Sequence, residues 1–276
     1  MTMRWSPLAL IFVFACLSTS DPDGEPSGDP EQASSQEPAN SGSVDAPVPV
    51  STGNRVVDSS ENPNPFGLTL YGRIEDAMAG TLDVGATFAD LDVGHGVGLL
   101  GGRDGAVLIT GGKALAATVE DGKAVTTPLT DPKAEITFFA GVPEPTWADH
   151  LQDSNLDAMA LGSRIANWQE STKTPDTAPI PFRIEGVFDK LVIHVPDGSK
   201  LKGKTTLKDH RKSGVTLEFA AEEAILIGLQ SPGHEGEFTH PGETILAHAI
   251  VGDPPQIGHV DDWSSAAGAV LKLPAR

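Results

Sequence analysis

The chain has 276 residues, a formal charge of −19 at pH 7, 30 glycines, 22 prolines and one cysteine. This length allows one large domain or two small ones. The acidic balance argues against a nucleic-acid partner, which needs a basic face, and a single cysteine excludes an internal disulfide.

Residues 1–16 have the pattern of a secretion signal. Arg4 precedes the apolar run of residues 8–15, which is far too short to span a bilayer as a helix. The only cysteine, Cys16, directly follows Val-Phe-Ala, a sequence that resembles a bacterial lipobox. We therefore predict an extracytoplasmic protein that a lipid anchor at Cys16 attaches to a membrane of the bacterial cell envelope. Simple secretion is the alternative, because Phe14 is bulkier than the residue that the lipobox pattern usually has.

Residues 17–65 consist mainly of Ser, Pro, Gly, Asp and Glu. A segment with almost no large aliphatic or aromatic residues cannot bury enough apolar surface to offset the entropy lost on ordering. The composition predicts a disordered, charge-extended tether.

Residues 66–178 are predicted to form an N-terminal β-rich subdomain. Strands are expected where apolar residues alternate or form short runs between Gly-rich turns, and helices where apolar residues recur at helical spacing. The expected elements are a strand at 66–71, short helices at 73–79 and 87–91, a β-meander over 94–125, a strand at 134–140, and a pair of helices at 147–153 and 155–168.

A break rich in Pro and Thr, at 172–181, precedes a C-terminal β-rich subdomain, residues 179–276. Residues 200–212 form a basic patch, interpreted as a solvated loop or as a docking site for an anionic group. The predicted fold class is α+β and predominantly β, with two mixed or antiparallel β-sheet subdomains and a few short helices. The strands expected in the second subdomain are 182–188, 191–195, 215–219, 224–229 and 270–273, with a histidine-rich stretch before the last.

That stretch, residues 233–261, is the strongest candidate for a functional site. It holds four of the eight histidines, which are His234, His240, His248 and His259. Neutral imidazole is a common ligand of zinc and related ions, and adjacent strands can bring several imidazoles together. The spacing matches no self-sufficient zinc motif, so exposed histidines in turns and at strand edges are the alternative.

Several short motifs carry a resemblance to a known family. They are Gly96-x-Gly98 with Arg103-Asp-Gly105, Gly111-Gly-Lys113, Ile136-Thr-Phe-Phe139, Phe182-Arg-Ile-Glu-Gly186-x-Phe188, and His248 followed eleven residues later by His259 in Gly258-His-Val260. Together they resemble the acetolactate decarboxylase family over roughly residues 68–274. Members of that family are metal-dependent lyases that remove carbon dioxide from 2-hydroxy-2-methyl-3-oxo acids.

The resemblance implies a site for zinc or another divalent metal. His248 and His259 are similar to the last two of the family's three histidine ligands, whereas Leu246 stands where the first would be. Ala106 replaces the glutamate that closes a Leu-Asp-Gly-Glu motif. His194 stands at the basic position that would orient the substrate's carboxylate, and the family's late acidic residue has no recognised counterpart.

A third metal ligand would have to come from elsewhere. Side chains alternate along a strand, so residues 246 and 248 share one face, and Leu246 points where the missing imidazole would be. If a hairpin turn at 241–244 has an odd number of residues, His240 joins that face; with an even number, Glu235 and Glu237 do. We favour His240 because imidazole suits the expected site, and a site without metal is the alternative.

Proton transfer would need a substitute for the missing glutamate. The catalytic candidates are Glu237 and Glu185, with Glu235 as a further alternative, beside His194, which would bind a carboxylate only when protonated. Two functions follow from these residues. The first is a metal-dependent carboxy-lyase acting on a small 2-hydroxy-3-oxo acid. The second is a catalytically inactive, lipid-anchored binding or structural module of the same fold; either could form a homodimer.

Overall fold

The computed structural model describes residues 55–56 and 64–275. The predicted signal segment at 1–16, the predicted lipidation site Cys16 and most of the predicted tether lie outside the described residues. None of the helices in the described part combines the length and the apolar character that a membrane crossing requires.

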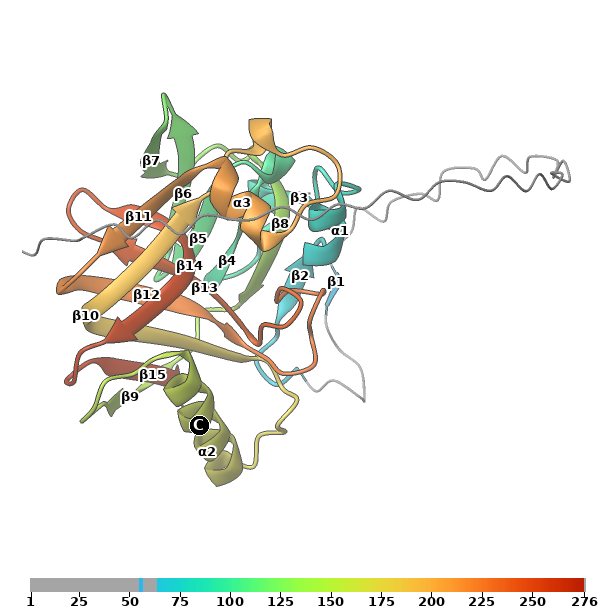
Figure 1. The fold of residues 1–276 in the computed structure, drawn as a ribbon. Helices are drawn as coiled ribbons and strands as arrows, with labels where there is room; N and C mark the ends of the chain where they lie inside the picture. The colour runs from blue at the N-terminus through green and yellow to red at the C-terminus, as the bar shows by residue number, and fades with distance from the viewer. Residues whose placement is uncertain (1–54, 57–63, 276) are drawn as a thin grey trace, which may run out of the picture. The chain divides into compact units, whose positions relative to one another are not determined.

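The first sheet is antiparallel and is built from the strands that come first in the chain (Figure 1). Its order is β1-β2-β8-β4-β5-β6-β7, and β3 pairs with β8. The meander predicted over 94–125 is confirmed as β4 to β7, and Asp121 and Gly122, both with positive φ, make the two-residue turn between β6 and β7. The strands are β1 (Arg55–Val56), β2 (Thr69–Tyr71), β3 (Ala86–Thr87), β4 (His95–Leu100), β5 (Ala106–Thr110), β6 (Lys113–Glu120), β7 (Lys123–Pro128) and β8 (Glu135–Val142).

The second sheet is also antiparallel, and part of it closes into a ring. Its order is β12-β13-β14-β10-β15-β9, with β11 on β10 and a further pairing of β12 with β10. The long strand β10 closes the ring because its first half pairs with β12 and its second half with β14. The strands are β9 (Trp147–Leu151), β10 (Ile180–Val195), β11 (Val215–Phe219), β12 (Glu222–Gln230), β13 (Ile245–Val251), β14 (Gln256–Ser265) and β15 (Val270–Pro274). The predicted fold class is confirmed.

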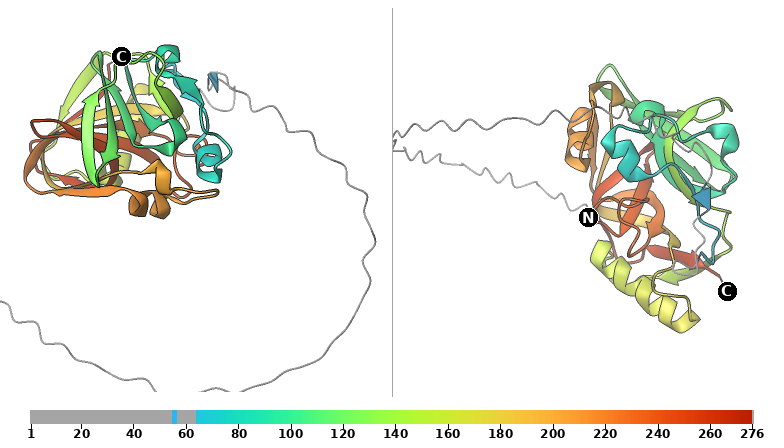
Figure 2. Two further views of the ribbon diagram at one scale, coloured as in Figure 1. Left: turned by 90° about the horizontal axis from the view of Figure 1, so that it is seen from above. Right: turned by 90° about the vertical axis from the view of Figure 1, so that its right-hand side faces the viewer.

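Hydrophobic cores hold the layers together. Helix α2 (Ala158–Thr172) covers the face of the second sheet that is turned away from the first sheet (Figure 2), and it buries Leu161 and Ile165 there. The other face of the second sheet packs against the first sheet through residues such as Leu246 and Phe138. The histidine-rich stretch contributes to this layer between the sheets.

The short helices differ in part from the sequence predictions. The two expected near residues 73–79 and 87–91 are confirmed as α1 (Ile74–Ala79) and η1 (Phe88–Asp90). The prediction of a helix at 147–153 is wrong. Residues Trp147–Leu151 instead pair with β15 as the edge strand β9, because tertiary pairing overrides local spacing. Helix α2 begins after Asp157, whose side chain accepts a hydrogen bond of 2.8 Å from the N–H of Ala160.

Three further boundaries differ. The solvated loop expected at 200–212 contains η3 (Gly198–Lys200) and α3 (Leu207–Ser213), and α3 starts with a capping box between Thr206 and Asp209. The strands expected at 182–188 and 191–195 are one continuous strand, β10, bent by an irregularity after Phe188. In addition, Arg55–Val56, which fall in the predicted tether, pair with β2.

Candidate functional site

Three histidines form a row across adjacent strands of the second sheet. His248 on β13 lies directly opposite His259 on β14, and His259 lies directly opposite His194 on β10. Residues directly opposite in neighbouring strands project from the same face of a sheet, so the three imidazoles are neighbours. All three side chains are buried.

A fourth histidine completes the group around His259. The ring centre of His259 lies 5.1 Å from that of His194, 5.5 Å from that of His248 and 5.4 Å from that of His240. In each pair the rings meet edge to face, at angles between 63° and 88°. We call His194, His240, His248 and His259 the histidine cluster.

His240 enters the cluster from a long connection and not from a hairpin strand. Strands β12 and β13 pair as far as Gln230 and Ile245, so residues 231–244 join them outside the ladder. The expected hairpin at 241–244 is therefore wrong, and strand alternation does not decide which side chain faces His248. The buried Phe238 and a backbone hydrogen bond of 2.7 Å from Ser231 N–H to the carbonyl of Thr244 position this connection.

Asp261 contacts the cluster and is a candidate site residue that the sequence motifs do not predict. Two residues after His259, it is the extra residue of a β-bulge, because β10 pairs with Val260 and then with Asp262. The bulge turns its carboxylate toward β10, where Oδ1 lies 2.8 Å from Nδ1 of His194 and 2.6 Å from Nε of Arg211. A carboxylate can only accept, so Nδ1 of His194 carries the proton, and its Nε2 keeps a lone pair when the ring is neutral.

His210 on α3 is a fifth histidine beside the cluster. It is buried, and its Nε2 lies 3.1 Å from the hydroxyl of Thr205. The basic composition of residues 200–212 does not indicate it, because such a composition is typical of a solvated loop. The Thr206–Asp209 capping box was the available signal, since a helix that starts there turns one face inward.

Four of these histidines, His210, His240, His248 and His259, are neutral at pH 7. Burial, followed by the electrostatic effect of the neighbouring His194, lowers the pKa of His240 to about 4 and that of His248 to about 3. The same two causes hold the pKa of His259 well below 6.5. Burial, with His240 as the next cause, lowers the pKa of His210 to about 3. Neutral imidazole is the form of histidine that binds metals.

The cluster borders a small cavity between the sheets. Its volume is about 10 Å³, which is close to the roughly 10–15 Å³ that one water molecule needs. Pockets that hold small organic ligands measure roughly 300–1,000 Å³, so this cavity admits a water or an ion but excludes an oxo acid. It is lined by the four cluster residues with His210, Leu246, Leu207, Ile74, Met78, Gly98, Leu99 and Phe138.

One cluster atom has no hydrogen-bond partner within the described part of the chain. Nδ1 of His248 is fully buried and unpaired there, and leaving such an atom unpaired costs about 1–3 kcal/mol. As the side chains stand, no group of three or more His, Cys, Asp or Glu among the described residues is arranged to hold a metal ion. The cluster thus supplies imidazole donors grouped around His259, with the rings packed edge to face.

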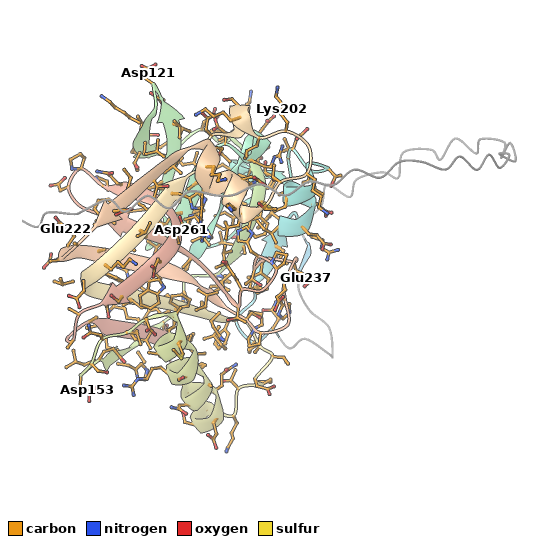
Figure 3. All side chains as sticks on the ribbon, in the orientation of Figure 1. Asp121, Asp153, Lys202, Glu222, Glu237 and Asp261 are labelled. Atoms are coloured by element: carbon orange, nitrogen blue, oxygen red, sulfur yellow. The ribbon has the colours of Figure 1, made fainter. Side chains whose placement is uncertain are left out.

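The structure does not bring the two predicted catalytic glutamates to the cluster. Glu185 contacts Arg183 and Lys272 on β10 and β15, and nine residues of extended strand put it about 30 Å along β10 from His194. Glu237 lies in the connection beside α1, where its carbonyl accepts from Ile74 N–H at 2.8 Å. Figure 3 shows Glu237 well apart from Asp261. Neither glutamate lines the cavity.

Comparison with solved structures identifies the fold. A protein of unknown function from Staphylococcus aureus, described as similar to alpha-acetolactate decarboxylase, is 18% identical, with a TM-score of 0.59 over 74% of this chain and 83% of its own. Acetolactate decarboxylase from Bacillus subtilis subspecies spizizenii is 17% identical, with a TM-score of 0.60 over 75% and 85%. The enzyme from B. subtilis strain 168 is 16% identical, with a TM-score of 0.59 over the same shares.

No protein-family model and no curated protein matches the chain. The resemblance predicted from the sequence motifs is therefore confirmed at the level of the fold, which is that of acetolactate decarboxylase.

Proposed function

We propose that this chain is a metal-binding member of the acetolactate decarboxylase fold, which holds zinc or a similar divalent ion in the histidine cluster. The single observation that carries the proposal is the in-register row His248, His259 and His194, with His240 beside it. In this proposal His194 supplies the imidazole that Leu246 cannot.

Three rings lie at distances from His259 that fit ligation of one ion by each pair. Zinc–nitrogen bonds of 2.0–2.1 Å at tetrahedral angles put the centres of two ligating imidazoles roughly 5 Å apart. The observed distances from His259 are 5.1, 5.4 and 5.5 Å. Ligation would then require rotation of the side chains out of their edge-to-face packing, with the strands left in place.

Asp261 supports His194 in this role. Metal-bound histidines commonly donate their second ring N–H to a carboxylate, which fixes the tautomer and the ring orientation. The hydrogen bond from His194 Nδ1 to Asp261 leaves Nε2 as the ligating atom. Arg211 donates to the same carboxylate oxygen from Nε at 2.6 Å and so holds Asp261 in place.

The geometry favours binding over catalysis. Structural zinc sites use four protein ligands, whereas catalytic sites keep one position open for water or substrate. Four histidines around a cavity of about 10 Å³ leave no room for a substrate. Ala106, buried at the position of the family's glutamate, has no group that moves a proton.

A carboxy-lyase acting on a small 2-hydroxy-3-oxo acid is the second candidate, and the fold favours it. A bound metal would supply Lewis-acid polarisation of the substrate's oxygens. In that case α3 would have to move, because Leu207 and His210 close the cavity. Arg211 would bind the substrate's carboxylate, and Glu243, whose pKa burial raises, would hold the proton.

Metal analysis and calorimetric zinc titration of the chelator-treated full chain test the proposal. We expect one zinc per chain, with binding lost in His259→Ala and weakened in His194→Ala. His150→Ala on the exposed face of β9 is the control and should bind like the unmodified chain. Absence of stoichiometric metal overturns the proposal. Carbon dioxide release from acetolactate by the zinc-loaded chain would establish the second candidate instead.

We also propose an extracytoplasmic location, with a lipid on Cys16. The support is the lipobox-like Val-Phe-Ala before the only cysteine. Mass spectrometry of the membrane fraction should find a diacylated N-terminal peptide that is absent from Cys16→Ser. A chain recovered only from the medium, without lipid, would instead indicate simple secretion.

A further inference from the structure

The segment that covers the histidine cavity carries a separate feature on its outer side. We call residues 197–213, which contain η3 and α3, the cover segment. Its inner side contributes Leu207 and His210 to the histidine cavity. Its outer side forms an open pocket of about 460 Å³, lined by Lys200, Lys202, Lys204, Lys212, Leu201, Thr205, Asp209 and Ser213.

The pocket concentrates positive charge on a strongly acidic chain. Four lysines line it together with one acid, Asp209, whereas the whole chain carries −19. Lys202 and Lys204 are exposed, and neither forms an ion pair with any residue that the structure describes. Figure 3 shows Lys202 at the outer edge of the molecule.

The acid in the pocket is already engaged. Asp209 accepts hydrogen bonds from the backbone N–H of Thr206 at 2.8 Å and from its hydroxyl at 2.7 Å, in the capping box that starts α3. Lys200 also has partners, since its ammonium group lies 2.9 Å from both Asp197 and the carbonyl of Ser213. The charges left for an external partner are therefore the ammonium groups of Lys202, Lys204 and Lys212.

The backbone that carries these lysines is held in place. The buried Arg103 donates to the carbonyl of Gly203 at 3.0 Å and to the hydroxyl of Thr205 at 3.3 Å. Thr205 N–H donates to the carbonyl of Met78 at 2.7 Å. Gly198 N–H donates to Asp104 at 3.0 Å. A pocket whose frame is already ordered loses less entropy when a ligand binds.

We propose that this pocket binds a phosphate-bearing anion. Lysine carries a compact point charge with rotatable donors, which suits phosphate oxygens. Several lysines together attract a multivalent anion far more strongly than they attract a ligand with one carboxylate. The volume of about 460 Å³ exceeds that of one phosphate and suits a phosphorylated small molecule or a phospholipid headgroup. This site is independent of the proposed metal, because it lies on the outer side of the cover segment.

Calorimetric titration of the full chain with pyrophosphate, in a buffer free of metal and phosphate, tests the proposal. The pocket variant is Lys202→Gln with Lys204→Gln. The control is Lys113→Gln with Lys123→Gln, an equal loss of charge on exposed lysines of β6 and β7. We expect the dissociation constant to rise at least tenfold in the pocket variant and less than twofold in the control, with unchanged melting temperatures.

A parallel arm identifies the source of the phosphate. The same three proteins are sedimented with vesicles of phosphatidylglycerol and phosphatidylcholine, and with vesicles of phosphatidylcholine alone. Binding to anionic vesicles without binding of pyrophosphate assigns the pocket to lipid headgroups, and the reverse assigns it to a free phosphorylated molecule. Equal weakening in both variants, or no binding of either probe, overturns the proposal.

Discussion

The buried histidines make the folded state sensitive to acid. His210, His240, His248 and His259 all have pKa values far below 6.5, whereas in the unfolded chain they return to about that value. The unfolded chain therefore binds more protons as the pH falls. Stability is complete above pH 6.5 and is lost progressively as the pH falls toward 4 and then 3.

The size of the effect follows from the number of histidines. At pH 5, which lies about 1.5 units below the pKa of an unfolded histidine, protonation stabilises the unfolded chain by about 2 kcal/mol for each histidine that stays neutral when folded. Together with His95, whose pKa burial also lowers to about 4, five such groups cost up to about 10 kcal/mol, which is comparable with the roughly 5–15 kcal/mol that stabilises a typical domain. The metal-free chain should therefore be close to unfolding at pH 5.

Urea unfolding followed by tryptophan fluorescence, at pH 8, 6 and 5 in the presence of a chelator, measures this dependence. His248→Gln should reduce the loss between pH 8 and pH 5 by about 2 kcal/mol, because one titrating group is removed. The exposed His150→Ala should leave the loss unchanged. An equal free energy of unfolding at pH 8 and pH 5 would refute the inference that these imidazoles are buried and neutral together.

Three further substitutions test the site and the fold. Leu246→His should restore zinc binding to the His194→Ala variant in a calorimetric titration, because residue 246 shares the strand face of His248; no recovery of affinity would contradict the proposed centre. Asp261→Asn should weaken zinc binding about 10- to 100-fold, through the hydrogen bond to His194, whereas Asp262→Asn should not. Asp157→Ala should lower the free energy of unfolding by about 1 kcal/mol in urea, because the N-cap of α2 is lost; a change below 0.3 kcal/mol would show that the cap is dispensable.

Local patterns predicted most of the strands. The meander from β4 to β7 is marked by turns that only glycine and a few polar residues adopt, so its boundaries follow from short-range sterics. Residues 147–151 have helical spacing, but their strand conformation depends on β15, more than a hundred residues later. No window of local sequence contains that partner.

The candidate site was predictable only in part. His248 and His259 were named from motif resemblance, and strand pairing places them opposite each other. Asp261 was missed because a bulge changes which face a residue joins, and nothing in the sequence marks that bulge. His210 was missed because the basic residues around it concealed a helix with an inward face.

Strand β9 falls within the predicted N-terminal subdomain, residues 66–178, yet it pairs with β15 near residue 274. A break in the backbone at residue 178 would leave β9 and α2 on one fragment and every strand they cover on the other. Neither fragment alone could complete its sheet edge, so the two should associate when expressed together. Split reporters fused at that position would then report assembly of the fold, and a circular permutant opened there would keep it intact.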